Sequence, residues 1–208
     1  MVYFKLDIYL VKNLLFLNFL AHVFLSGDDF PLAVGNLIAD QVKVKEVQNY
    51  PIQIQNGIRL HRAIDHFTDT HPLFKECVTE LFPIYRHYSR VIVDMYFDHF
   101  LAVHWNSFHP LTLKDFSTLF YNRLRNSDIE FSDKLNRFID SLITFNWFEQ
   151  YRSVEGLKNI MTHMDKRTRF DSNFGKSTDE LICMKAAIDV AEIGISKMRS
   201  ELKPGMTE

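Results

Sequence analysis

Glycine, proline and cysteine are all scarce in this chain of 208 residues, which holds seven glycines, six prolines and two cysteines. We find no long alternating strand pattern, low-complexity tract or linker, so little favours a β-rich or multidomain protein. Cys77 and Cys183 support no disulfide framework and are interpreted as reduced thiols of a cytoplasmic protein. The sequence therefore predicts an all-α fold in a single compact domain.

An excess of charge of either sign is also missing, because the formal net charge is −2. A general nucleic-acid-binding protein normally has a strongly basic balance, so nucleic acid is not an expected partner. The charge-free run from Asn13 to Leu25 is shorter than the ~20 residues of a membrane span and contains Asn18 and His22. We therefore predict a buried helix there rather than a membrane span or a secretion signal. The sequence leaves the oligomeric state open.

Capping residues and first-turn prolines mark where helices begin. These signals are Asp29, His71 with Pro72, Thr112 with Asp115, Ser132, Ser153, and Ser177 with Glu180. They predict eight or nine helices, at about residues 5–25, 30–42, 50–69, 72–82, 84–106, 113–127, 132–146, 154–168 and 178–201.

The stretch "VIVDMYFDHF" is apolar on almost every side, yet it carries Asp94 and Asp98. Residues four apart lie on one face of a helix, so the two carboxylates would repel each other. Burying a carboxylate costs several kcal/mol unless the charge is paired. The stretch therefore implies a nearby cation, either an arginine or a metal ion.

The same spacing recurs in three other segments, "NFLAH", "NLIAD" and "HRAIDHFTD". If the helices converge, up to five acids meet, and Arg59 and Arg62 balance only two of them. A site of carboxylates and imidazole suits Mn²⁺ or Fe²⁺, with Zn²⁺ and Mg²⁺ as less favoured choices. The predicted metal ligands are Asp40, His61, Asp65, Asp69, Asp94 and Asp98.

The polar residues in these helices also have simpler interpretations that require no metal. A lone Asn or His on an apolar helix is commonly a hydrogen-bonded core residue, which applies to Asn36, His22 and His99. The whole protein is alternatively a helical interaction module without enzyme activity, in which arginines pair with the acids. Those arginines are Arg59, Arg62, Arg86 and Arg90.

Four ordered motifs carry a family resemblance: "LNFLAHVFLS", "VGNLIADQV", "GIRLHRAIDHFTDTHP" and "VDMYFDHFLAVHW". Together they resemble the acyl carrier protein phosphodiesterase family, a divergent branch of the HD metal-dependent phosphohydrolases. The resemblance covers roughly residues 17–170. It implies an HD-phosphohydrolase-like helical domain over residues 17–203 that depends on a divalent metal, usually Mn²⁺. Residues 1–16 are then an N-terminal extension with no assigned role.

The resemblance also implies a reaction, hydrolysis of the phosphodiester that joins 4′-phosphopantetheine to a serine of holo-acyl carrier protein. The residues it places in catalysis are Asp40, His61, Asp65 and Asp98, and those it places on the substrate are His22, Asn36, Arg62 and His99. The order Asp98-His99 reverses the usual His-Asp pair, so which acids bind the metal directly stays open. The alternative substrate is a nucleotide or another small phosphate ester.

An acidic carrier protein would need a local basic rim on its enzyme. Lys43 and Lys45 follow directly after Asp40, within ~8 Å of axial rise if the helix continues, and are the first candidates. Lys166, Arg167 and Arg169 are the second group.

Overall fold

The computed structural model describes residues 19–165 and 174–181, which form α-helices, short 3₁₀ helices and no strand. The α-helices are α2 (Phe19–Leu25), α3 (Phe30–Ile38), α4 (Ile52–Thr70), α5 (Pro72–Tyr85), α6 (Ser89–Val103), α7 (Leu113–Arg125), α8 (Asp133–Thr144), α9 (Trp147–Gln150), α10 (Val154–Asp165) and α11 (Phe174–Leu181). The 3₁₀ helices are η1 (Ala39–Gln41), η2 (Val44–Asn49), η3 (Arg86–Tyr88) and η4 (Trp105–Ser107). The predicted all-α class is confirmed.

Most of the predicted helix starts are confirmed by their hydrogen bonds. The Asp29 carboxylate accepts a bond from the Leu32 amide at 3.1 Å, which caps α3. The Thr112 hydroxyl accepts one from the Asp115 amide at 3.1 Å, which caps α7. Three further helices begin directly after the expected residues, namely α5 after His71, α8 after Ser132 and α10 after Ser153. Local capping chemistry thus sets these boundaries.

Two predicted boundaries are wrong. The helix expected from residue 84 is interrupted, because α5 runs on to Tyr85 and Arg86 adopts a φ of 52°, so α6 begins only at Ser89. The last helix was expected to begin after Ser177, but α11 begins at Phe174 and holds Ser177 in its interior, buried against α6. The remaining predicted helical residues, 5–18, 166–168 and 182–201, lie outside the described residues.

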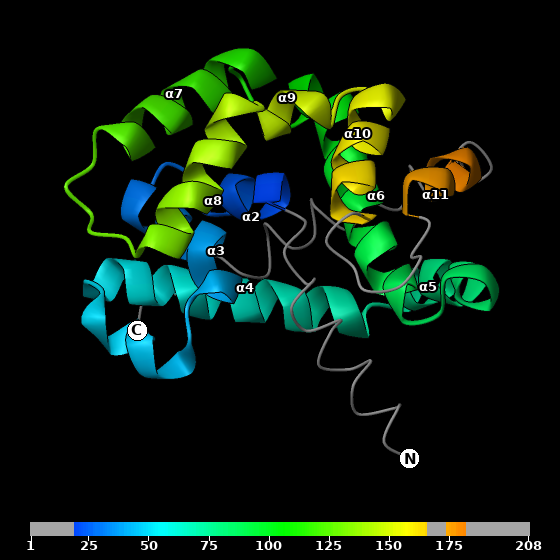
Figure 1. Cartoon of the computed structure of the whole chain (residues 1–208), viewed down its shortest axis with the longest axis horizontal. Helices are drawn as coiled ribbons and strands as arrows, with labels where there is room; N and C mark the ends of the chain where they lie inside the picture. The colour runs from blue at the N-terminus through cyan, green and yellow to red at the C-terminus, as the bar shows by residue number, and fades with distance from the viewer. Residues whose placement is uncertain (1–18, 166–173, 182–208) are drawn as a thin grey trace.

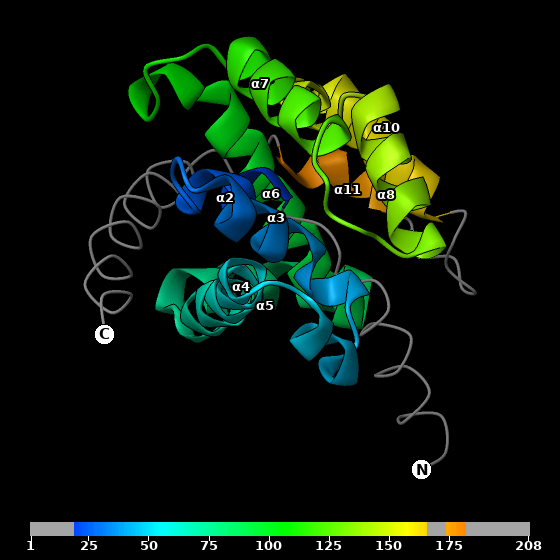
Figure 2. The same ribbon diagram turned by 90° about the vertical axis from the view of Figure 1, so that its left-hand side faces the viewer.

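The central elements of the fold are α2 and α3. They lie between α4 on one side and α8 on the other, and α6 runs alongside α10 toward α5 (Figures 1 and 2). Helix α2 contacts both α3 and α6, and α3 packs along α4. The largest fully buried side chains include Trp105, Tyr96 and Tyr151. The four segments with polar residues in apolar surroundings therefore lie on neighbouring helices.

Helices α3 and α4 cross with their backbones in direct contact at two glycines. A Cβ atom on Gly35 would lie 2.0 Å from the Ile54 carbonyl oxygen, and one on Gly57 would lie 2.1 Å from the Leu32 carbonyl oxygen. Real Cβ atoms do not approach a backbone oxygen so closely, so this crossing requires glycine at both positions. It brings the turns that follow Gly35 and Gly57 against each other.

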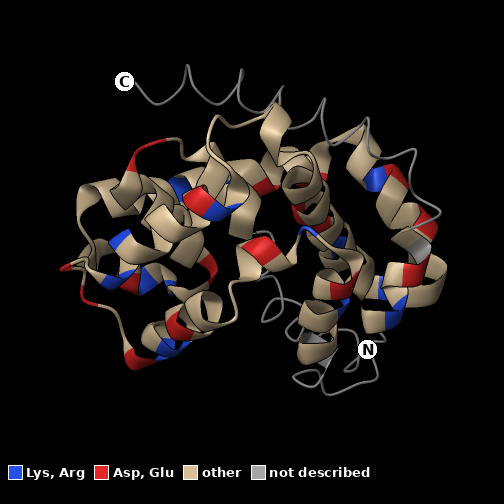
Figure 3. Cartoon of the chain, turned by 90° about the horizontal axis from the view of Figure 1, so that it is seen from above, with Lys and Arg blue, Asp and Glu red and all other residues tan. Residues whose placement is uncertain are grey.

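Basic and acidic residues are interspersed along the helices in the view from above (Figure 3). Within the described ranges, the structure contains no helix that is both long and apolar enough to cross a membrane.

Candidate functional site

Side chains from two helices meet where α2 approaches α4. His22 of α2 and His61 and Asp65 of α4 each offer one ligand atom, and these atoms all lie within 4.8 Å of one another. Within residues 19–165 and 174–181, no other group of His, Cys, Asp or Glu is arranged in this way. Both histidines are buried, whereas the Asp65 side chain is 46% exposed. The group therefore has a buried floor and an open side.

Both imidazoles direct a nitrogen at the same carboxylate. His61 Nε2 lies 3.3 Å from one Asp65 oxygen, and His22 Nε2 lies 3.4 Å from the other. His61 Nε2 also lies 3.2 Å from Asp40 Oδ2, which η1 places at the end of α3. Two imidazoles and two carboxylates thus share one small volume.

Asn36 fixes the orientation of this group from behind. Its backbone carbonyl lies 2.8 Å from His61 Nδ1 and can only accept, so Nδ1 carries the hydrogen and Nε2 faces the carboxylates. Its side-chain amide donates to the His22 carbonyl at 2.7 Å and to the Ser26 hydroxyl at 3.0 Å. Asn36 is fully buried. In this structure it contacts the segments that carry the two histidines, whereas the sequence suggested a place on the substrate.

The carboxylates favour a positive charge at this position. Burial lowers the pKa of His61, but the close carboxylates of Asp40 and Asp65 outweigh it and raise that pKa to about 10. Burial raises the pKa of Asp65, yet contacts with His22 and His61 hold it below its usual range. The pKa of His22 is lowered by burial and by the charge of His61. Either a proton on His61 or a bound cation satisfies the two acids.

The residues fit a divalent metal ion by an independent criterion. Both ring nitrogens of His22 and Nε2 of His61 are buried and have no hydrogen-bond partner among the described residues. Their 3.2–3.4 Å contacts with the carboxylates lack hydrogen-bond geometry. Buried polar nitrogens are rarely left in this state unless another group engages them. Imidazole nitrogens with carboxylate oxygens are a common donor set for Zn²⁺, Mn²⁺ and Fe²⁺.

Asp98 lies outside this three-residue group, and its partners are on α2. Its two oxygens accept hydrogen bonds from the Leu20 amide at 3.1 Å and the Ala21 amide at 2.8 Å. The carboxyl group is fully buried, and burial raises its pKa to about 8 despite these donors and the Tyr151 hydroxyl. Asp98 therefore anchors the helix that presents His22.

Asp69 and Asp94 lie beside the group, close to an arginine. Asp69 forms an ion pair with Arg90 of α6. Burial raises the pKa of Asp94, the charges of Asp65, Asp69 and Asp98 add to this effect, and Arg90 opposes it. From the sequence, Arg90 was expected only to pair with an acid in the non-enzymatic alternative. The signal that could have identified it is the row of residues 90, 94 and 98, which share one face of α6.

The other predicted residues occupy different environments. His99 is buried, and its Nδ1 lies 2.6 Å from the Tyr151 carbonyl, to which it donates a hydrogen bond. Arg62 is exposed on α4, and Lys43 and Lys45 are exposed at the start of η2. Lys166, Arg167 and Arg169 lie outside the described residues.

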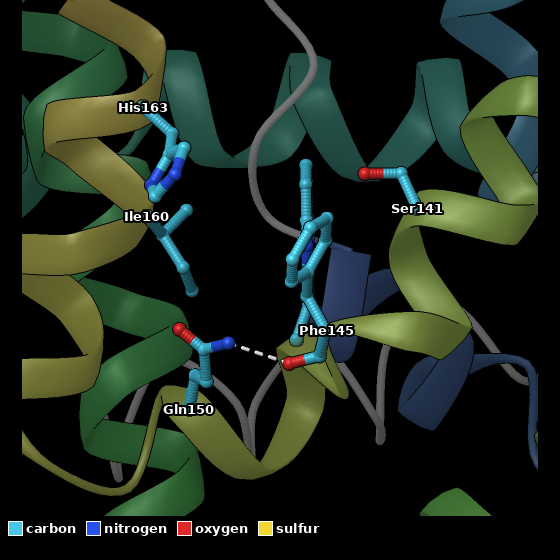
Figure 4. A pocket seen from close by; sticks show the side chains of 6 residues that line it. Ser141, Phe145, Gln150, Ile160 and His163 are labelled. Carbon is cyan, nitrogen blue, oxygen red and sulfur yellow. Dashed lines mark hydrogen bonds between the residues drawn. The ribbon is translucent and has the colours of Figure 1, made fainter.

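A separate pocket lies between α8, α9 and α10 (Figure 4). Phe145, Trp147 and Ile160 line it, together with Ser141, Gln150 and His163. The Gln150 amide donates to the Phe145 carbonyl at 2.5 Å, which closes one end. This lining is mainly apolar and includes no carboxylate, so it lacks the ligand set of the group formed by His22, His61 and Asp65.

The fold and this site define a class, an all-helical protein with a candidate divalent-metal centre of imidazole and carboxylate groups. Comparison with known sequences identifies the family within this class. The sequence model of the family described as acyl carrier protein phosphodiesterase matches residues 17–191. The chain belongs to that family, whose members are phosphodiesterases, so it is an enzyme of the phosphodiesterase type.

Individual relatives support the same assignment. The chain is 35% identical over 156 residues to an acyl carrier protein phosphodiesterase of Yersinia pestis, a match that covers 73% of this chain and 79% of the relative. It is 31% identical over 161 residues to one of Enterobacter sp. strain 638, which covers 75% of this chain and 82% of that protein. No solved structure matches the chain.

Proposed function

We propose that this protein is a metal-dependent phosphodiesterase that acts on holo-acyl carrier protein in the cytoplasm. The bond cleaved is the phosphodiester between 4′-phosphopantetheine and a serine, and the products are apo-acyl carrier protein and 4′-phosphopantetheine. The main support is the meeting of His22, His61 and Asp65, where both ring nitrogens of His22 and Nε2 of His61 are buried without a hydrogen-bond partner among the described residues. The proposed substrate, acyl carrier protein, is taken from the names of the relatives.

His22 Nε2, His61 Nε2 and a carboxylate oxygen of Asp65 would hold the cation, with Asp40 at its edge. When bound, a divalent ion supplies Lewis acidity toward the anionic phosphodiester and lowers the pKa of water. Mn²⁺ is the proposed ion, with Fe²⁺, Zn²⁺ and Mg²⁺ as alternatives, because the donor set mixes nitrogen with oxygen. His22 is therefore proposed as a metal ligand and not as a substrate-binding residue, the role that the sequence suggested.

The remaining residues position this centre and keep it accessible. The Asn36 carbonyl holds the His61 proton on Nδ1, which leaves Nε2 free to bind metal. Asp98 holds the first turn of α2 and thus acts on His22 through the backbone. Asp65 and Asp40 side chains are 46% and 26% exposed, so a phosphodiester at the surface of a folded protein can reach them.

The helix that was expected to run on through Lys45 ends earlier, because Val42 is extended after η1, so the basic rim is proposed for the segment that follows this break. Lys43 and Lys45 are exposed, they flank Val44 at 79% exposure, and they follow Asp40 within five residues. An acidic partner with an apolar spot would find complementary charge and one exposed methyl-bearing side chain here. We assign this segment to carrier-protein docking.

The function is tested by incubating purified protein and Mn²⁺ with holo-acyl carrier protein and recording intact-protein mass spectra. Loss of the phosphopantetheine mass from the carrier protein is the expected result. The same preparation is assayed against nucleotides and small phosphate esters. Faster release of phosphate from those compounds, with no change in the carrier protein, would refute the proposed substrate.

A further inference from the structure

Arg90 is held in place at the N-terminal end of α6 by two contacts. Its guanidinium forms an ion pair with Asp69 of α4, and it lies over the Phe74 ring of α5, 5.7 Å from the ring centroid. The side chain nevertheless stays 43% exposed. The guanidinium is thus oriented by protein groups on two sides while part of it remains accessible to solvent.

The position of Arg90 relates it directly to the candidate metal centre. Its partner Asp69 follows Asp65 by four residues on α4, which is one helical turn, about 6 Å of axial rise. On α6, Asp94 follows Arg90 by one turn, and its charge interacts with Asp65, Asp69 and Arg90. Arg90 therefore lies at the edge of the acidic group, on the side where Asp65 and Asp69 are about half exposed.

The other arginines named as candidates from the sequence lie in surroundings that differ from those of Arg90. Arg62 is exposed and is turned ~100° from His61 around α4, so it flanks the row of His61, Asp65 and Asp69 instead of standing in line with His61. Arg59 donates a hydrogen bond to Asn56. Arg86 lies over the Phe82 ring at 5.9 Å, at the break between α5 and α6, and shares with Arg90 the contact with an aromatic ring.

We propose that Arg90 binds a non-bridging oxygen of the substrate phosphodiester beside the metal centre, a role that the sequence suggested for Arg62. This inference rests on the proposed function, because it concerns the recognition of that phosphodiester. A guanidinium has five N–H donors, so it can keep Asp69 as a partner and bind a phosphate oxygen at the same time. Asp69 and Phe74 hold its plane in advance, which reduces the entropy lost on binding.

The test compares Arg90→Gln with the matched control Arg86→Gln, which removes the same charge from the same region and also uncovers an aromatic ring. Four quantities are measured for each: kcat and KM for holo-acyl carrier protein, the affinity of the Mn²⁺-loaded protein for inorganic phosphate by calorimetry, the metal content, and Tm. We expect Arg90→Gln to weaken phosphate binding and raise KM by about tenfold or more, the effect of one charge-assisted bond. Arg90→Lys should recover part of the phosphate affinity, because it restores the charge but not the planar fork.

Removing a half-exposed ion pair costs little stability, so in the Arg90→Gln protein Tm should change little and metal content should stay at the wild-type level. Equal phosphate affinity in the Arg90→Gln and Arg86→Gln proteins would overturn the inference, and so would a loss of activity that only follows lost metal or a lowered Tm. If the wild-type protein leaves holo-acyl carrier protein intact, the proposed function fails, but the calorimetric comparison still decides whether Arg90 binds phosphate.

Discussion

The imidazole rings of His22 and His61 stack, with their centroids 3.9 Å apart and their planes inclined by 17°. Two protonated rings at this separation would repel each other strongly in a buried place, so at most one carries a positive charge. This agrees with the opposite directions of their pKa shifts, downward for His22 and upward for His61. A metal ion between Nε2 atoms would need both rings neutral, so metal binding should release a proton from His61.

Removal of divalent metal should abolish activity and lower stability together. A ligand present at 100 times its Kd stabilises the folded state by about 2.7 kcal/mol, and chelation withdraws that contribution. The measurement is Tm and turnover after dialysis against a chelator, followed by addition of Mn²⁺, Fe²⁺, Zn²⁺ or Mg²⁺. Full turnover by protein shown to be metal-free would contradict the metal centre.

Alanine at either stacked histidine should remove the metal but leave the helical fold. His22→Ala and His61→Ala each delete one of the nitrogen ligands, so the bound metal per chain should fall well below that of the wild type. His163→Ala is the control, since His163 is an exposed histidine whose Nδ1 contacts the Asn159 carbonyl of its own helix. Metal content is measured by elemental analysis. Wild-type content in both cluster variants would exclude the proposed ligands.

Replacement of Asp98 by Asn should destabilise the fold. Both oxygens of the Asp98 carboxyl group accept from α2 backbone amides, whereas the Asn amide offers one acceptor oxygen, so one buried N–H would face the donor NH₂ group. Leaving a buried group unpaired costs about 1–3 kcal/mol in the free energy of unfolding. Urea unfolding measures it, with Asp140→Asn on the exposed face of α8 as the control. Equal midpoints for the two variants would argue against the anchoring role.

His99 should make stability depend on pH below neutrality. Burial lowers its pKa in the folded state, so the ring stays neutral there while the unfolded chain takes up a proton near pH 6.5. Its contribution is therefore complete above pH 6.5 and is lost as the pH falls through that value. Between pH 7.0 and 5.5 the wild type should lose more unfolding free energy than His99→Gln. Parallel pH profiles of the two proteins would refute this prediction.

Charge reversal at the basic rim should affect docking rather than chemistry. The double variant Lys43→Glu/Lys45→Glu should raise KM for holo-acyl carrier protein at low ionic strength, change kcat little, and flatten the salt dependence of kcat/KM. Lys114→Glu/Lys158→Glu is the control for net charge, because it alters exposed lysines of α7 and α10 by the same amount. An unchanged KM in the first variant would place docking on another surface.

The helical class, most helix starts and the residue types of the site follow from the sequence. Periodicity places His61 and Asp65 on one face of α4, because residues four apart on a helix are neighbours whatever surrounds them. The same rule identified the polar spacing in "NFLAH" and "NLIAD". The sequence also predicted a cation for a surplus of buried acids. Of the five acids only Asp98 is buried, whereas the side chains of Asp65 and Asp69 are about half exposed.

Which faces meet was decided only by tertiary packing. The contact of α3 with α4 at Gly35 and Gly57 sets the Asn36 carbonyl against His61. The four-residue spacing predicted both Asp65 and Asp98 as metal ligands. In the structure Asp65 lies against two imidazoles, whereas Asp98 accepts hydrogen bonds from the α2 amides. Periodicity relates residues within one helix, whereas the partner across an interface depends on crossing angle and backbone separation, which arise from the packing of whole helices.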